Sequence, residues 1–224
     1  MRFYENQLFH IYNQGNNRQQ IFFSDENYHF FLWRMRGYLL PFGDFIGWAL
    51  MPNHYHWLFY VRKIEITRNA LWKHADEIEF QRRIKKYGLK KAMPVQPEPK
   101  RKVNGEDLIS LNESIGIIER SYAAAINKQN ESSGSLFRQK AKAKDGWINE
   151  FITETKANGK KDPRFMPGND YGYKCLMYLH DNAKTAGLVT ENNQWKFSSA
   201  RDYAGLRKGS LCNLKLGHEL INFI

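Results

Sequence analysis

Two histidines separated by one residue are the first feature of this sequence that could do chemistry. His54 and His56 stand in a β-rich stretch, residues 54–61, that is otherwise dominated by aromatic and aliphatic side chains. Alternate residues of a strand project to the same side, so both imidazoles could reach one cation. The alternative is a pair of partly buried histidines in an aromatic strand. A third ligand from another part of the chain would favour the metal site.

Tyr178 and Asn182 could supply the other half of such a site. They are four residues apart on a helix that the pattern predicts over about 173–185, ending before Gly187. Residues i and i+4 share a helix face, so an amide oxygen could complete a metal site beside a phenol that acts as nucleophile. Ordinary core packing of Tyr178 is the alternative. Three other tyrosines compete for the nucleophile's role: Tyr122, Tyr171 and Tyr173.

Four basic residues alternate along the segment 138–144. If this segment is a strand, it presents one basic row that suits a phosphate backbone. A solvated edge strand protected by lysines would show the same pattern. The four residues are Arg138, Lys140, Lys142 and Lys144.

The overall composition agrees with a polyanionic partner. The 224 residues include 34 Lys or Arg and 23 Asp or Glu, a net charge of +11, and nucleic acid is the commonest partner of such chains. A hydrophobic content of 42% excludes a disordered chain, and no apolar run is long enough to span a membrane. The start of the sequence lacks the apolar stretch of a secretory signal. Two cysteines make no zinc cluster or disulfide framework and fit a reducing cytoplasm.

The elements that must position these residues alternate between strand and helix. We expect strands at 8–12, 45–51 and 54–61, a helix from Ser24 to about residue 40, and another helix over about 108–130. This order predicts an α+β fold with helices packed on an antiparallel sheet. Residues 62–103 carry thirteen Lys or Arg against five Asp or Glu, and we interpret them as a basic insertion with a helix over about 67–91 and a proline-broken linker at 93–99.

Several motifs together resemble one known family. The segment 51–58, MPNHYHWL, resembles the M-P-N-H-x-H signature of the single-tyrosine HUH transposases, and most closely that of the REP-associated tyrosine transposases. Further blocks follow in the family's order: HIYNQGNNR at 10–18, SY at 121–122 with GSLFR at 134–138, YLHDNAKTAGLV at 178–189 and WKFSSA at 195–200. Gln14 stands where relatives often have Arg, and Ala183 where they usually have Pro.

The resemblance implies roles for individual residues. It makes His54, His56 and Asn182 the ligands of Mg²⁺ or Mn²⁺, and Tyr178 the nucleophile. It implies an RRM/ferredoxin-like HUH endonuclease fold, with residues 1–224 as a single domain that carries the 62–103 insertion. Residues expected to contact DNA are Arg18, Arg138, Lys140, Lys142 and Lys144.

The implied activity is metal-dependent nicking and strand transfer on single-stranded or hairpin DNA, through a 5′-phosphotyrosine link. The protein would be a cytoplasmic, nucleoid-associated bacterial protein, either a monomer or a homodimer. Two other classes stay open. One is a domesticated, non-catalytic protein that binds hairpin DNA, and the other is a metal-dependent hydrolase that uses water as its nucleophile.

Overall fold

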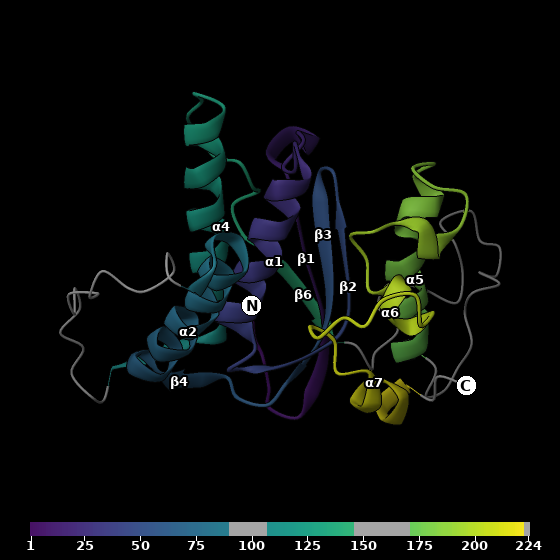
Figure 1. The fold of residues 1–224 in the computed structure, drawn as a ribbon. Coiled ribbons are helices and arrows are strands. Elements are labelled where there is room, and N and C mark those ends of the chain that lie inside the picture. Colours follow the sequence, from purple (N-terminus) through teal and green to yellow (C-terminus); the bar gives the residue numbers. More distant parts are fainter. Residues whose placement is uncertain (90–106, 146–170, 222–224) are drawn as a thin grey trace. The chain divides into compact units, whose positions relative to one another are not determined.

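The computed structural model describes residues 1–89, 107–145 and 171–221, which belong to two compact units (Figure 1). The first unit combines Met1–Phe23, Asp44–Arg62 and Ser135–Ile224, and the second combines Ser24–Gly43 and Lys63–Gly134. The linker expected at 93–99 lies outside the described residues. Each unit is described by itself below.

A four-stranded sheet forms the centre of the first unit. Its strands are β1 (Gln7–Gln14), β2 (Gly43–Met51), β3 (His54–Val61) and β6 (Lys142–Asp145), in the order β2-β3-β1-β6. β1 pairs antiparallel with both β3 and β6. Along the chain, α1 (Asp25–Leu39) separates β1 from β2, and α4 (Leu111–Gln129) precedes β6. This β-α-β-β-α-β order with β1 in the middle is the ferredoxin-like topology, so the α+β prediction is confirmed.

The register of β1 determines which residues share a face of the sheet. Tyr12 lies opposite His56, and Gln14 lies opposite His54. On its other side, β1 places His10 opposite Lys144 and Tyr12 opposite Lys142. Directly opposed residues project to the same face, so the candidate histidines, His10, Tyr12 and both β6 lysines occupy one face.

The strand β6 is shorter than the predicted basic row. Phe137 bridges to Gly15, whereas Lys142 pairs with Tyr12. The chain thus advances five residues from Phe137 to Lys142, while the paired positions on the other strand advance only three, from Gly15 to Tyr12. The two extra residues bend away from the ladder as a bulge does. Arg138 and Lys140 therefore precede the strand, and only Lys142 and Lys144 are part of it. The strand that the basic row would need thus covers only two of the four basic residues.

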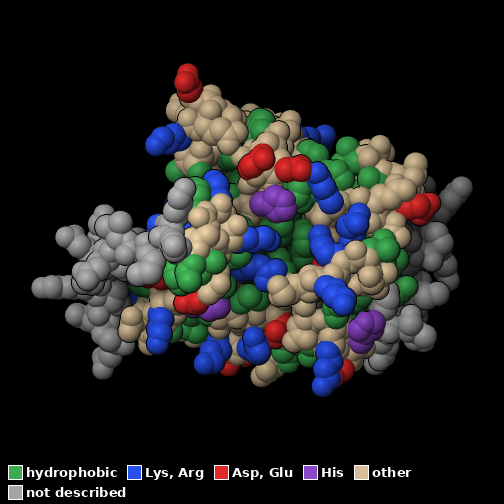
Figure 2. Space-filling model, viewed as in Figure 1, with side chains coloured by type: hydrophobic (Ala, Val, Ile, Leu, Met, Phe, Trp, Pro, Cys, Tyr) green, Lys and Arg blue, Asp and Glu red, His purple; other side chains and the backbone are tan. Residues whose placement is uncertain are grey.

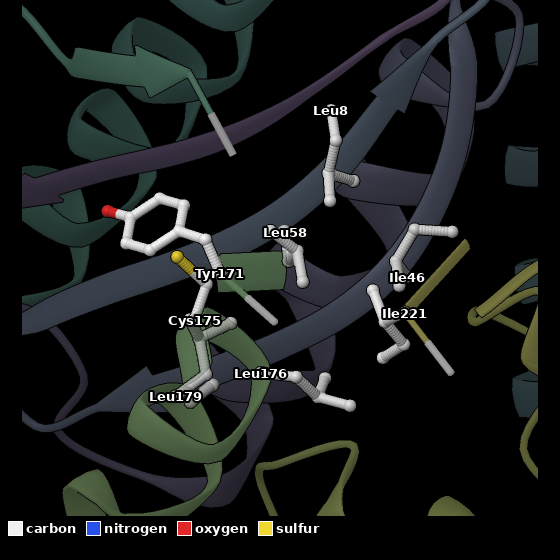
Figure 3. Packing of buried hydrophobic residues seen from close by; sticks show 9 residues of the cluster. Leu8, Ile46, Leu58, Tyr171, Cys175, Leu176, Leu179 and Ile221 are labelled. Atoms are coloured by element: carbon white, nitrogen blue, oxygen red, sulfur yellow. The ribbon is translucent and has the colours of Figure 1, made fainter. Parts of the chain in front are cut away.

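Helix α5 (Tyr171–Thr185) packs its apolar side against the sheet of the first unit. Its buried residues meet strand residues in the cluster drawn in Figure 3: Tyr171, Cys175, Leu176 and Leu179 from the helix, with Leu8, Ile46 and Leu58 from the strands. The helix ends at Thr185, and the turn that follows contains Gly187, whose φ of 70° suits a residue without Cβ. The shorter helices α6 (Ala200–Tyr203) and α7 (Leu214–Ile221) complete this unit.

Gly47 in β2 permits the close approach of α5. A Cβ atom at this position would clash with Cδ1 of Leu176, because the two atoms would lie closer than non-bonded carbon atoms can come. The glycine therefore provides the space into which Leu176 fits, and Leu176 is completely buried.

The second unit is mainly helical. It contains α1, α4, α2 (Arg68–Tyr87) and a two-stranded ladder of β4 (Glu65–Thr67) with β5 (Leu108–Ser110). The sequence predicted that a helix begins near residue 108. Residues 108–110 instead pair with β4, and the helix starts at Leu111 because Ser110 caps it through a capping box with Glu113.

The segment predicted as an insertion contributes α2 and β4 to the second unit. Thr67 caps α2 by accepting a hydrogen bond from the backbone N–H of Ala70, close to the predicted start of this helix. The bounds of the insertion and the single-domain description stay predictions. Among the helices of residues 1–89, 107–145 and 171–221, none is long and apolar enough to cross a membrane.

We predict that Leu176→Ala lowers the free energy of unfolding by about 2–5 kcal/mol, because it leaves a cavity between α5 and the sheet. Chemical denaturation of both proteins measures this difference. The matched control is Leu206→Ala, at a leucine that is 57% exposed, which should change stability by less than about 0.5 kcal/mol. Equal effects of the two substitutions would show that α5 is not anchored through Leu176.

Candidate active site

The two histidines of β3 and the tyrosine of α5 meet on one face of the sheet. The rings of His54 and His56 are 5.0 Å apart between centroids. The ring of Tyr178 meets that of His56 edge to face, with centroids 5.5 Å apart and an interplanar angle of 87°. Residues more than 120 positions apart in the sequence therefore form one cluster, as a site built from both motifs requires.

Asn182 joins the same cluster from the next turn of α5. Its side chain contacts the imidazole of His54, where it stabilises the protonated form of the ring. Its Nδ2 atom is buried and has no hydrogen-bond partner within the described part of the chain. A buried N–H group of this kind is costly unless a ligand or water completes it. The structure thus brings together all four predicted catalytic residues, and their roles remain predictions.

His10 and Tyr12 of β1 also belong to this cluster, although sequence reasoning did not single them out. Nε2 of His10 lies 2.8 Å from Nδ1 of His56, and His10 is only 1% exposed. Tyr12 stacks on His56 with 5.7 Å between ring centroids. The signal was present in the sequence, because His10 and Tyr12 alternate on a strand in the same way as His54 and His56.

The imidazole of His54 is held by the residue that precedes it. Nδ1 of His54 lies 2.6 Å from Oδ1 of Asn53. The Nδ2 group of Asn53 donates to the backbone oxygen of Arg18, at 3.3 Å. Arg18 is the last residue of the short 3-10 helix η1 (Asn16–Arg18) and has a left-handed φ of 60°. The turn after β1 therefore supports His54 through Asn53.

Burial keeps the histidines of the cluster neutral at physiological pH. The pKa of His10 is lowered to about 3, mainly by burial and further by the nearby charge of Lys144. The pKa of His56 is lowered well below its usual value by burial and by the two neighbouring histidines. Burial also lowers the pKa of His54, and its contact with Asn182 partly opposes this effect. Neutral imidazole is the form that binds metal ions.

Exposure and position distinguish Tyr178 from its competitors. Tyr178 is 49% exposed, so its hydroxyl can reach a macromolecular substrate. Tyr171, the first residue of α5, is buried in the core, and Tyr122 is completely buried in the second unit, where burial raises the pKa of its phenol. Tyr173 is five residues from Tyr178 and thus points about 140° away around α5. Tyr12, which stacks on His56, is a further candidate for the role of nucleophile.

Only two of the five residues predicted to contact DNA lie on the sheet face of this cluster. Lys142 and Lys144 share its face of the sheet, and the charge of Lys144 acts on His10. Arg18, Arg138 and Lys140 are exposed residues outside the strands. The backbone N–H of Arg138 donates to the backbone oxygen of Gln14, next to the histidine face. Figure 2 shows Lys and Arg side chains spread among hydrophobic ones over the viewed surface.

The donor set for a metal is unusual in composition. Within the described ranges, no group of three or more His, Cys, Asp or Glu side chains could hold a metal ion. The candidate site instead combines two imidazoles with the amide of Asn182. Such a site would have room for water and substrate oxygens as further ligands, which is how Mg²⁺ and Mn²⁺ are often held.

The fold and the site together describe an α+β protein with a histidine pair and a half-exposed tyrosine on one face of its sheet. No protein-family model matches the chain, and no curated protein matches its sequence. Among solved structures, the chain is similar to a REP-associated tyrosine transposase bound to a REP hairpin, with 12% identity and a TM-score of 0.43. The match covers 95% of this chain and 92% of that one.

We predict that the free energy of unfolding falls as the pH is lowered from about 6.5. The pKa of His10 and that of His180 are both lowered to about 3 by burial. At pH values between about 3 and about 6.5, these histidines are protonated in the unfolded chain and neutral in the folded chain. Each of them therefore lowers the free energy of unfolding by up to about 1.4 kcal/mol for each pH unit below about 6.5. Urea unfolding at several pH values between 7.5 and 5 measures this slope.

His180 provides the variant that tests this assignment. Its Nε2 atom lies 2.8 Å from Oγ of Ser199, away from the candidate site. In His180→Gln, one of the contributions disappears, so stability should depend less steeply on pH, even if the variant is less stable overall. A slope that is unchanged, or stability that increases on acidification, would contradict the expectation.

Proposed function

We propose that this protein is a metal-dependent nuclease and strand transferase that acts on single-stranded or hairpin DNA, with Tyr178 as its nucleophile. The observation that carries the proposal is the meeting of Tyr178 with His56, while His54 and Asn182 lie in the same cluster. The sequence motifs that resemble the REP-associated tyrosine transposases support the same activity. A cytoplasmic location would fit this activity.

The residues present fit a divalent cation. His54 and His56 are neutral, and the Asn182 side chain stabilises positive charge at the His54 ring, as it would a cation held there. We propose that these three side chains hold Mg²⁺ or Mn²⁺. When bound, the cation would polarise the scissile phosphate and offset the negative charge that develops on its oxygens.

Tyr178 would perform the covalent step. Its Oη attacks the phosphorus of a phosphodiester, the new O–P bond forms, and the bond from phosphorus to the 3′ oxygen breaks. The phenol proton passes to solvent, and the departing 3′ oxygen takes up a proton to become a free 3′-OH. The 5′-phosphotyrosine retains the phosphodiester, so attack by a 3′-OH of DNA can rejoin a strand without a nucleotide cofactor.

The remaining groups of the face would position the strand. The half-exposed phenol leaves room for a backbone to approach, whereas the imidazoles behind it are mostly buried. Lys142 and Lys144 extend the same face with positive charge. The buried N–H of Asn182 is suited to donate to a phosphate oxygen. We propose that these contacts hold an unpaired strand across the sheet.

We predict that Tyr178→Phe abolishes the covalent protein–DNA adduct, because it removes the attacking oxygen and keeps the ring. The assay incubates the purified protein with an end-labelled, hairpin-forming single strand and Mn²⁺, followed by a denaturing gel. Tyr12→Phe is the matched control, since Tyr12 contacts the same histidine. It should still form the adduct.

The same gel distinguishes the other classes of function. An adduct that survives in Tyr178→Phe and is lost in Tyr12→Phe would assign the nucleophile to Tyr12. Cleavage to free 5′-phosphate ends without an adduct would indicate a hydrolase. Binding of the hairpin without cleavage, in the presence of either metal ion, would indicate a non-catalytic DNA-binding protein.

We predict that Lys142→Ala and Lys144→Ala weaken the binding of single-stranded DNA and reduce its salt dependence. Each lost phosphate contact should lower the slope of log K against log salt by about 0.7. Fluorescence anisotropy at several salt concentrations measures both effects. Lys215→Ala on α7 is the control, since its side chain is 88% exposed outside the sheet face. An equal change in slope for Lys215→Ala would mean that the two lysines make no special contact.

A further inference from the structure

The two candidate metal-binding histidines share a feature that the proposed activity does not itself require. In each of them, Nδ1 is within hydrogen-bond distance of a dedicated partner: Asn53 for His54, and His10 for His56. The His54 ring has a further polar contact, with the side chain of Asn182. A neutral imidazole carries its proton on only one nitrogen, so a partner at Nδ1 can decide which nitrogen is left to bind a cation.

For His54 the direction of the hydrogen bond follows from the chain of contacts. The backbone oxygen of Arg18 can only accept, so the side-chain atom of Asn53 that faces it must be the Nδ2 donor. The other atom of the amide, Oδ1, then faces His54 and can only accept. Nδ1 of His54 must therefore carry the proton, and its Nε2 presents a lone pair.

For His56 the partner is another imidazole. The 2.8 Å separation between Nε2 of His10 and Nδ1 of His56 fits one hydrogen bond, in which one nitrogen donates and the other accepts. If His56 donates, its Nε2 is free to bind a cation, and His10 holds its own proton on Nδ1. This arrangement gives both ligand histidines the same tautomer.

Packing alone gives no reason for an imidazole at position 10. His10 is 1% exposed, and the residue opposite to it on β3, Leu58, is a completely buried aliphatic residue. Leu8, the neighbour of His10 on the same face of β1, is also aliphatic and completely buried. An aliphatic side chain would fill such a place without the cost of burying a polar ring. The imidazole is therefore best explained by its hydrogen bond to His56.

We propose that His10 and Asn53 are positioning residues that fix His56 and His54 as Nδ1–H tautomers, so that both Nε2 atoms face one divalent cation. The proposal rests on the proposed function, since it concerns the same cation. Hydrogen bonds of this kind orient metal-binding histidines in many proteins, and their loss costs about 10–100-fold in metal affinity. His10 does so from the neighbouring strand, and Asn53 from the turn between β2 and β3.

The first experiment needs no variant. Two-bond ¹H–¹⁵N correlation spectra of the metal-free protein at pH 7.5 report the tautomer of each imidazole, and the seven histidines can be assigned by single substitutions. We expect both His54 and His56 to be protonated on Nδ1. A spectrum in which His56 is protonated on Nε2 would overturn the role of His10, and the same result for His54 would overturn that of Asn53.

The second experiment measures Mn²⁺ affinity by titration calorimetry without DNA. His10→Phe keeps an aromatic ring but has no acceptor, and should weaken binding about 10–100-fold. His10→Gln retains an acceptor near the position of Nε2 and should recover most of the affinity. Asn53→Ala should weaken binding over a similar range. Thermal unfolding of each variant shows that it is folded, and Asn53→Ala, at a partly exposed turn residue, provides a test even if His10→Phe does not fold.

The outcomes separate this proposal from the proposed function. Wild-type protein that binds Mn²⁺, with His10→Phe and Asn53→Ala binding equally well, would overturn the positioning roles and leave the proposed function intact. Equal loss in His10→Phe and His10→Gln would overturn the hydrogen bond as the reason for His10. Wild-type protein that binds no Mn²⁺ would overturn the metal-dependent function and, with it, the role of both residues toward a cation.

Discussion

The candidate site depends above all on the register between β1 and β3. Pairing Tyr12 with His56 and Gln14 with His54 puts the residues of both strands on one face at the spacing that their contacts require. A slip of one residue would turn every side chain of β1 to the opposite face and separate His10 from His56. The packing of Leu8 in the cluster with α5 resists such a slip, because the slip would turn Leu8 away from this cluster. Core packing and site geometry are therefore specified by the same pairing.

Helix α5 supplies the second half of the site, and here too the packing of the core determines the geometry of the site. Its buried residues, among them Leu176 and Leu179, fix the rotation of the helix against the sheet. Tyr178 and Asn182 lie beside this buried stripe, so the rotation that fills the core also directs them toward β3. The result is a gradient of exposure: His10 and His56 are buried, His54 is partly buried, and the phenol of Tyr178 is half-exposed. The group that we propose as the nucleophile is thus the most accessible one.

Much of the fold could be predicted from the sequence, because helix caps and strand breaks are specified by neighbouring residues. Ser24 and Thr67 cap the helices that were expected after them, and the break at Pro52 and Asn53 separates β2 from β3 as predicted. The spacing of the histidines, and that of Tyr178 and Asn182, also indicated which residues share a face. Pairing between strands that are far apart in the sequence could not be predicted. The sequence does not show that residues 108–110 pair with β4, or that extra residues lie between Phe137, which bridges to Gly15, and the start of β6.

The same distinction explains what was missed in the site. His10 gains its significance only through the register with β3, which brings it within 2.8 Å of a residue 46 positions away. Asn53, by contrast, was visible as part of a motif, but the direction of its hydrogen bonds depends on the turn after β1. Sequence spacing can therefore suggest ligands, whereas the residues that orient them emerge only when the strands are placed.

The left-handed backbone of Arg18 has a consequence for how this surface can change. An arginine in that conformation costs about 1–2 kcal/mol relative to the ordinary helical region. Asn53 binds only the main-chain oxygen of residue 18, so the support of His54 does not depend on which side chain stands there. The guanidinium is therefore free to meet a ligand outside the site. The side chain at position 18 can therefore be exchanged as the binding partner changes, while the backbone oxygen at the same position continues to support His54 through Asn53.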